Sequence, residues 1–309
     1  MSHLQTSDAR RSVGVIGLGQ MGRGIAANLG RAGLLRAVFD IDPEAWGRTG
    51  LAADVGWLSP SEIGNVCQTV LFVVPASPQI ESCLGGPDGL LVQRHDRQVL
   101  VDLTTSYPAD TLRLARMAEQ AGRAYLDCGM TGGAAGADAG ALTLMTGGDS
   151  DVLERVRPVL ETIASRIFHV GASGAGHALK LVHNMVLHSV FLATCEGCRL
   201  AERAGIDPEK AIEVMNAGNA RSFITEIRFP RHILSGTFDG RSTVSNLAKD
   251  LKMAARLARE IGAPARYGRL ACALLDEAVE TGMGKEDFTR LYHRIDELIE
   301  EEARERSGA

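Results

Sequence analysis

A short apolar segment followed by three regularly spaced glycines constrains this chain more than any other feature. Residues 13–16 are typical of a buried strand, and Gly17, Gly19 and Gly22 follow it in the spacing Gly-x-Gly-x-x-Gly. Apolar residues then recur at helical spacing up to Leu29, and Asp40 ends the next predicted strand. A glycine loop between a strand and a helix, with an acid at the end of the following strand, indicates a dinucleotide-binding turn.

The three glycines have different predicted tasks. Gly17 permits the tight turn, Gly19 lets the backbone approach a pyrophosphate, and Gly22 lets the helix pack closely on the strand. The helix N-terminus adds amide donors and a partial positive charge. We therefore expect the phosphates of a cofactor at Gly17, Leu18, Gly19, Gln20, Met21 and Gly22. The alternative is that these glycines only turn the chain.

Asp40 indicates which dinucleotide is bound. Its carboxylate can accept hydrogen bonds from a ribose 2′-hydroxyl and would repel a 2′-phosphate. Asp42 adds a second negative charge, and no arginine lies between Arg36 and Arg48. The sequence therefore predicts NAD as the cofactor rather than NADP.

Strand and helix patterns alternate through the first half of the chain, which indicates βαβ units and a mostly parallel sheet. The predicted strands are 13–16, 35–39, 70–74, 98–103, 124–126, 142–145 and 167–170, and a helix is expected over 107–121. One long, almost wholly apolar helix follows at 176–204, and the later patterns are all helical: 209–215, 223–233, 244–261, 265–281 and 287–306. We predict an α/β Rossmann-type N-terminal domain, residues 1–172, joined by the long helix to an all-α C-terminal domain, residues 173–309.

Composition excludes several other classes of protein. The chain has 309 residues, 45% hydrophobic residues and a net charge of −5 with no long basic run, so we expect a globular protein without a nucleic-acid surface. We found no apolar stretch approaching the roughly 20 residues of a membrane span, and the polar N-terminus does not resemble a signal peptide. Six dispersed cysteines predict a reducing cytoplasm, and the Cys195-x-x-Cys198 pair lies in a helical pattern, so we expect no metal or redox site there.

Lys180 stands out in the long helix. Only 5 of the 33 basic residues are lysines, and none precedes residue 180. A helix that is apolar nearly all round is buried, and burial favours the neutral form of a lysine, which can then act as an acid or base near neutral pH. Asn184 lies one turn further on the same face. The alternative is a lysine that extends to solvent near the helix start.

A glycine-dense stretch follows the predicted strand at 124–126. It runs from Asp127 to Gly133 and continues through Gly136 and Gly140. Exposed backbone amides and the Thr131 hydroxyl would suit a carboxylate. On composition alone the stretch is equally compatible with a flexible loop.

Together these segments resemble the β-hydroxyacid dehydrogenase family, which includes 3-hydroxyisobutyrate dehydrogenase and tartronate semialdehyde reductase. The resemblance runs from Val13 to about Tyr292 and depends on motifs in the family's order. These are the glycine loop with Ala26-x-Asn28-Leu29, the segment 127–133 where the family usually has Asp-Ala-Pro-Val-Ser-Gly-Gly, Asp102-Leu103-Thr104-Thr105, the segment 171–184 with Lys180 and Asn184, and Lys249-Asp250-Leu251.

The resemblance implies roles for individual residues. Lys180 would be the catalytic acid/base, and Asn184 would orient the substrate or the lysine. The substrate carboxylate would be held by Thr131, Gly132 and Gly133, and the cofactor site would also include Val74, Pro75, Thr105 and Lys249. The C-terminal domain would resemble that of 6-phosphogluconate dehydrogenase.

Three positions depart from the family's pattern. Thr131 replaces serine, which keeps the hydroxyl but adds a methyl group, and His183 stands where asparagine is common. Gly129 replaces proline, which we expect to loosen the substrate loop. These departures leave the exact substrate open.

The leading interpretation is hydride transfer between NAD and the β-hydroxyl carbon of a small β-hydroxycarboxylic acid, of the 3-hydroxyisobutyrate or 2-hydroxy-3-oxopropionate type. One alternative is imine reduction on the same scaffold, and another is a non-catalytic binding protein with a dehydrogenase-like fold. Both usually lack the lysine, so Lys180 argues against them.

The C-terminal segment bears on assembly. Apolar residues recur there at helical spacing, at Leu291, Ile295, Leu298 and Ile299. This stripe can pack on its own domain or on a second subunit, and the family resemblance also implies oligomers. We predict a homodimer or homotetramer that uses the helical domain as its interface.

Overall fold

The fold of the chain was obtained as a computed structural model, which describes residues 12–93, 95–296 and 298. The chain divides into two compact units between Lys180 and Leu181. We call the part up to Lys180 unit 1 and the part from Leu181 unit 2. The domain boundary predicted between residues 172 and 173 stays a prediction.

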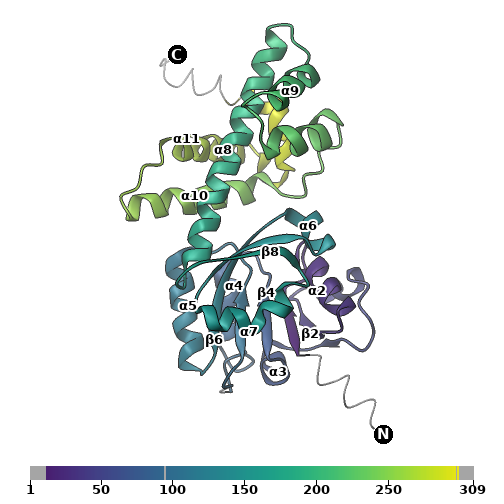
Figure 1. Cartoon of the computed structure of the whole chain (residues 1–309), viewed down its shortest axis with the longest axis vertical. Coiled ribbons are helices and arrows are strands. Elements are labelled where there is room, and N and C mark those ends of the chain that lie inside the picture. Colours follow the sequence, from purple (N-terminus) through teal and green to yellow (C-terminus); the bar gives the residue numbers. More distant parts are fainter. Residues whose placement is uncertain (1–11, 94, 297, 299–309) are drawn as a thin grey trace. The chain divides into compact units, whose positions relative to one another are not determined.

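Unit 1 is built on an eight-stranded sheet whose spatial order is β3-β2-β1-β4-β5-β6-β7-β8 (Figure 1). The strands are β1 (Val13–Ile16), β2 (Leu35–Phe39), β3 (Gly56–Trp57), β4 (Thr69–Phe72), β5 (Val99–Asp102), β6 (Ala124–Thr131), β7 (Leu142–Gly147) and β8 (Ala164–Gly171). All neighbouring strands run parallel except β6 and β7, which are antiparallel. The predicted mostly parallel Rossmann-type sheet is therefore confirmed.

Helices connect these strands and cover the sheet. They are α2 (Gly22–Arg31), α3 (Pro60–Val66), α4 (Ser77–Leu84), α5 (Pro108–Gln120), α6 (Gly133–Ala139) and α7 (Ser150–Leu160), with a 3₁₀-helix η1 (Pro43–Arg48) after β2. Two separate hydrophobic clusters form in this unit, one containing Val15 and Val101 and the other Ile16 and Leu100. Successive residues of a strand point to opposite faces, so apolar residues on both faces of β1 and β5 indicate a sheet covered on both sides.

The prediction for residues 127–131 needs a correction. They continue strand β6 instead of forming a loop, and Gly129 pairs with Met145 of β7. The expectation that Gly129 loosens a substrate loop is therefore wrong. Glycine has a low strand propensity, which is why the composition of this segment resembled a loop.

The long predicted helix is α8 (Ala175–Arg203) (Figure 1). By length and composition it could cross a membrane, with a hydropathy of 1.3 over its most apolar window. This corrects our expectation that no apolar stretch reaches that length. Core helices of globular proteins meet the same criterion, and α8 contributes Phe191, Cys195 and Cys198 to the core of unit 2.

After α8, unit 2 is helical in its described residues apart from an isolated bridge between Thr243 and Asp287. Its elements are α9 (Pro208–Ala217), a π-helix η2 (Ile224–Leu234), α10 (Val244–Glu260), α11 (Arg266–Glu280) and two 3₁₀ turns, η3 (Met283–Lys285) and η4 (Phe288–Arg290). Helices α10 and α11 pack side by side (Figure 1). The all-α prediction is confirmed.

The apolar stripe near the C-terminus lies mostly inside unit 2. Leu291, Ile295 and Leu298 are buried in its hydrophobic cluster, and Ile299 lies outside the described residues. Because these side chains already pack on their own unit, they do not provide the subunit interface that we inferred from them. The oligomer itself stays a prediction.

Candidate functional site

The glycine loop has the geometry that its sequence predicts. Gly17 has a φ angle of +98°, a conformation that favours glycine. A Cβ atom at Gly22 would lie 1.9 Å from the carbonyl oxygen of Gly17, so helix α2 can begin this close to β1 only with glycine there. A Cβ atom at Gly19 would have no neighbour within 4 Å. The space beside Gly19 is thus open, and the loop residues fit a pyrophosphate.

The loop lies where the strand order reverses. The chain runs outward from β1 to β2 and β3, and then returns to the other side of β1 with β4. In open α/β sheets, ligands bind at the carboxyl ends of the strands on either side of such a reversal. Val74 and Pro75 follow β4 there, and Thr105 follows β5. The structure therefore brings these predicted cofactor residues to the same edge of the sheet as the glycine loop.

Asp40 follows β2 at this edge, and its carboxylate closes onto the loop. Its Oδ2 accepts a hydrogen bond from the Leu18 amide at 2.6 Å, and its Oδ1 accepts one from the Asp42 amide at 2.9 Å. The sequence did not indicate which cation lies near Asp40 and Asp42. The 3₁₀-helix η1 turns Arg48 back to form an ion pair with Asp42. The Arg48 hydrogen bond lowers the pKa of the Asp42 carboxyl.

The predicted substrate residues lie at the end of β6. Thr131 is the last residue of the strand, and Gly132 and Gly133 turn the chain into α6 with φ angles of +123° and +62°. Both glycines are exposed. Their backbone is accessible to a small ligand, as carboxylate binding requires.

The first turns of α8 lie directly on β6 and β7. The carboxylate of Asp127, a buried residue of β6, accepts hydrogen bonds from the amides of Gly174 at 2.7 Å and His177 at 2.9 Å. These amides belong to the start of the helix, where backbone donors have no partner within the helix. Asp127 therefore fixes the start of α8 on the strand that leads to Thr131.

Lys180 follows one turn later. Its side chain is 8% exposed, and the stem passes over Gly129 of β6. Gly129 has no side chain, so the lysine Cβ occupies the space above it. Lys180 and the proposed carboxylate turn thus belong to the same unit and are both positioned by β6.

A buried polar network lies behind the lysine. The ring of His177 contacts the Thr111 hydroxyl at 2.7 Å through Nδ1 and the Asp102 carbonyl oxygen at 3.3 Å through Nε2. The Tyr125 hydroxyl donates to Asp102 Oδ2 at 2.8 Å. Burial raises the pKa of the Asp102 carboxyl above its usual value, although His177 and the Tyr125 hydroxyl act in the opposite direction. The sequence did not identify this network, because its members come from β5, α5, β6 and α8.

Unit 2 contributes a separate cluster. Asn184 donates through Nδ2 to Asp250 Oδ2 at 2.6 Å, and His183 Nδ1 lies 3.1 Å from Asn184 Oδ1. Lys249 Nζ lies 3.6 Å from Asp250 Oδ1. The sequence singled out Asn184 and Lys249, and the structure joins them through Asp250. A fixed amide of this kind can orient a neighbouring group.

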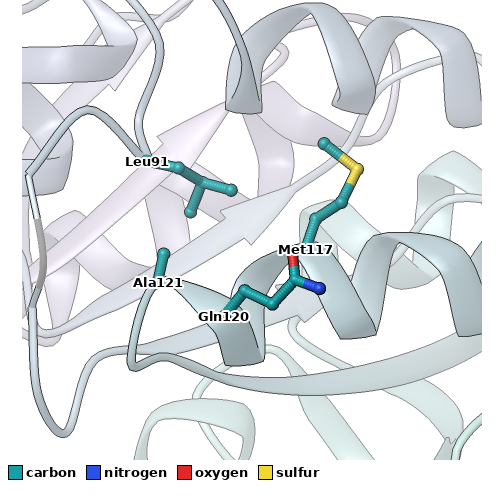
Figure 2. Close-up of a pocket in the computed structure, with 4 residues that line it drawn as sticks. All are labelled: Leu91, Met117, Gln120 and Ala121. Carbon is teal, nitrogen blue, oxygen red and sulfur yellow. The ribbon is translucent and has the colours of Figure 1, made fainter.

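Two other features are unconnected with this site. A shallow pocket lined by Leu91, Met117, Gln120 and Ala121 lies where α5 ends, before the amino end of β6, whereas Thr131 marks the carboxyl end (Figure 2). The Cys195 and Cys198 thiols are buried in α8, and burial raises the pKa of Cys198 to about 11 and that of Cys195 well above its usual value. Both stay protonated near neutral pH, which argues against redox chemistry.

A dinucleotide-type loop at the carboxyl edge of a mostly parallel sheet, together with a buried lysine packed on β6 of the same sheet, is typical of NAD(P)-binding oxidoreductases. Comparison with known proteins gives the family. Residues 12–171 match the NAD-binding domain of 6-phosphogluconate dehydrogenase. Residues 174–295 match the NAD-binding domain of NADP-dependent 3-hydroxyisobutyrate dehydrogenase.

Relatives cover almost the whole chain. An L-threonate dehydrogenase of Cupriavidus necator is 33% identical over 90% of this chain and 93% of its own length. A 2-(hydroxymethyl)glutarate dehydrogenase of Eubacterium barkeri is 30% identical over 90% of this chain and 92% of its own length. The solved structure of Mycobacterium tuberculosis 3-hydroxyisobutyrate dehydrogenase with L-serine is 28% identical, with a TM-score of 0.83, and covers 92% of this chain and 99% of that one. The chain belongs to the β-hydroxyacid dehydrogenase family.

The buried network leads to a prediction about stability. Because the folded state raises the pKa of Asp102, it favours the protonated carboxyl, and the resulting stabilisation is lost as pH rises through the folded-state pKa. Tyr125→Phe removes a hydrogen bond to the ionised form, so it should raise that pKa further. We expect the variant to lose about 1–3 kcal/mol of unfolding free energy at about pH 8 and less at about pH 3.5, below the ordinary pKa of an aspartate, where the folded carboxyl is protonated.

Urea unfolding at the two pH values measures this difference. Ser165→Ala is the control, because Ser165 is exposed in β8 and its hydroxyl should contribute little. An equal loss for Tyr125→Phe at both pH values would show that its hydroxyl does not stabilise a charged Asp102.

Proposed function

We propose that this chain transfers a hydride between NAD and the hydroxyl carbon of a small β-hydroxycarboxylic acid, with Lys180 as the general acid/base. The observation that carries the proposal is the position of Lys180. It is buried in α8 against β6, and the same strand ends at the half-buried Thr131, before the exposed Gly132 and Gly133. An amine and a carboxylate-binding turn on one strand can act on one small molecule.

The proposed chemistry divides between the cofactor and the chain. When bound, the nicotinamide supplies the hydride chemistry. In the oxidative direction, Lys180 Nζ takes the proton of the substrate hydroxyl as the carbon loses a hydride and becomes a carbonyl. In reduction, the same atom returns the proton to the oxygen. Thr131 and the two glycines hold the carboxylate, which fixes the hydroxyl carbon, and Asn184 orients the substrate or the lysine.

The names of the relatives support this substrate class. They include 3-hydroxyisobutyrate dehydrogenase of Pseudomonas aeruginosa and an NAD-dependent L-serine dehydrogenase of the same species. Both named substrates carry a hydroxyl on the carbon β to a carboxylate. We propose an acid of the 3-hydroxyisobutyrate or 2-hydroxy-3-oxopropionate type for this chain, acting in the cytoplasm.

The preference for NAD rests on charge. Asp40 stands at the end of β2 beside Asp42, so a ribose 2′-phosphate at this position would meet two carboxylates. Arg48 is close enough to offset them, but it is paired with Asp42. The 2′-hydroxyl of NAD carries no such charge.

Replacement of the lysine tests its role. Lys180→Met keeps most of the buried stem and removes the amine, so we expect kcat to fall about 10²–10⁴-fold. Cofactor binding, followed by NADH fluorescence, should change little, because the amine handles only the proton. Lys252→Ala is the control, since Lys252 is exposed in α10 and ion-paired with Asp276. A loss of only a few-fold in kcat would remove Lys180 from this role.

Cofactor choice can be tested at Asp40. Asp40→Asn keeps an oxygen for the Leu18 amide but removes the charge, so the ratio of kcat/KM with NAD to that with NADP should fall roughly 10- to 100-fold, the range for a hydrogen bond to a charged group. Asp151→Asn, at an exposed position of α7, is the control. Higher kcat/KM with NADP than with NAD in the wild-type chain would overturn the preference.

We also propose a homo-oligomer, most simply a two-fold dimer, built through the helical unit. An exposed apolar surface on α8 and α11 supports this proposal. Helices α8 and α11 meet closely at Met185 and Gly268, and apolar side chains next to this contact remain exposed: Val182, Val186, Tyr267 and Leu270. Exposed apolar side chains gathered in this way are typical of subunit contacts.

Sedimentation equilibrium at micromolar concentration decides the assembly. We expect a mass of at least twice 32.9 kDa for the wild-type chain, and a shift toward the monomer for Tyr267→Asp. Leu200→Asp, at an exposed apolar position further along α8, is the control. A fully active monomer across the concentration range would refute the proposal.

A further inference from the structure

Alternate residues of β6 carry the parts of the candidate site that lie in unit 1. Side chains two apart in a strand point to the same face, so Asp127, Gly129 and Thr131 share one face of β6. Asp127 binds the amides at the start of α8, Gly129 lies under Lys180, and Thr131 begins the proposed carboxylate turn. One face of one strand therefore meets both the lysine helix and the substrate turn.

With α8 positioned as it is in this chain, the contact at Gly129 leaves no room for a side chain. A Cβ atom there would lie 2.5 Å from the Cβ of Lys180 and 2.9 Å from the carbonyl oxygen of Gly176. Gly176 repeats the pattern from the helix side, where a Cβ atom would lie 2.4 Å from the Met145 oxygen and 2.5 Å from the Asp127 oxygen. Backbone thus packs on backbone where α8 crosses the sheet.

Backbone conformation does not require glycine at position 129. Gly129 is not among the glycines that have a positive φ angle, and it pairs with Met145 as an ordinary strand residue. The Lys180 side chain, together with the Gly176 carbonyl oxygen, occupies the space that a side chain would need there. The usual reason for a glycine, a turn or a left-handed conformation, therefore does not apply.

We propose that Gly129 is a positioning residue for Lys180. The missing side chain lets α8 lie at a height above β6 that brings the amine to the substrate held at Thr131. A larger residue would lift the first turns of the helix and carry Lys180 away from the strand. For its catalytic consequence the inference rests on the proposed function, since misplacement of a reacting group by about 1 Å can cost about 10²-fold in rate.

The test compares two glycine-to-alanine variants with similar clashes. Gly129→Ala crowds the lysine, whereas Gly64→Ala in α3 places a Cβ atom 2.7 Å from the Leu90 oxygen, away from the lysine. Both should lower the melting temperature. Only Gly129→Ala should lower kcat, by about 10- to 100-fold, with an unchanged dissociation constant for NADH measured by fluorescence. Equal kcat in the two variants would overturn the proposal.

Crystal structures of the wild-type and Gly129→Ala chains give a readout that needs no substrate. We expect Lys180 to move away from β6 in the variant, and an unmoved lysine would overturn the proposal. If the wild-type chain oxidises no β-hydroxyacid, the proposed function fails, while this displacement still decides the role of Gly129.

A second variant covers the case in which Gly129→Ala does not fold. Lys180→Gly removes the nearest clashing atom and leaves the 2.9 Å approach to the Gly176 oxygen, so the double variant Gly129→Ala/Lys180→Gly should recover part of the soluble folded protein. Failure of this rescue, judged by circular dichroism, would show that the Gly176 backbone and not Lys180 excludes a side chain at position 129, which would overturn the proposal.

Discussion

The contact between the start of α8 and the strands β6 and β7 is the interaction on which the rest of the site depends. A buried carboxylate is costly unless hydrogen bonds satisfy it. Asp127 meets that need with the amides of Gly174 and His177, which would otherwise lack partners at the helix start. Glycine at position 176 then lets the helix backbone touch the strands. Lys180 inherits its position from these contacts, one turn further along.

The same sheet positions the cofactor residues. The glycine loop follows β1, Val74 and Pro75 follow β4, Thr105 follows β5, and Thr131 ends β6. These four strands are neighbours in the sheet and run parallel. Their carboxyl ends therefore meet at one edge. Distant parts of the sequence reach a common site because a parallel sheet brings the end of each strand to the same side.

The sequence predicted those features that depend on local pattern. Strands β1 and β2 have the predicted bounds, since apolar runs beside a glycine turn leave little choice. The prediction placed Gly129 in a loop because glycine is rare in strands. The pairing with Met145 and the contact with Lys180 explain why a glycine lies in β6. The sequence did not indicate that Arg48 lies near the acids after β2, because it is several residues further along the chain. The 3₁₀-helix η1 brings it back to an ion pair with Asp42.

Contacts between distant residues account for most of what the sequence could not show. Asp250 is 66 residues from Asn184, and nothing in either local pattern indicates that they bond. The burial of Ile295 is likewise a property of the folded unit. An apolar stripe has the same sequence pattern whether it packs on its own unit or on a second copy of the chain.

The division of the chain inside α8 bears on how the chemistry is organised. Lys180 closes unit 1, and Asn184 stands one helical turn later in unit 2. Unit 1 alone therefore contains the glycine loop, Asp40, the proposed carboxylate turn and the proposed proton acceptor. The position of Lys180 relative to the glycine loop and to the proposed carboxylate turn follows from one sheet and its contacts. Asn184 and Lys249, which both contact Asp250, belong to the helical unit, so their positions follow from helix packing and not from the sheet.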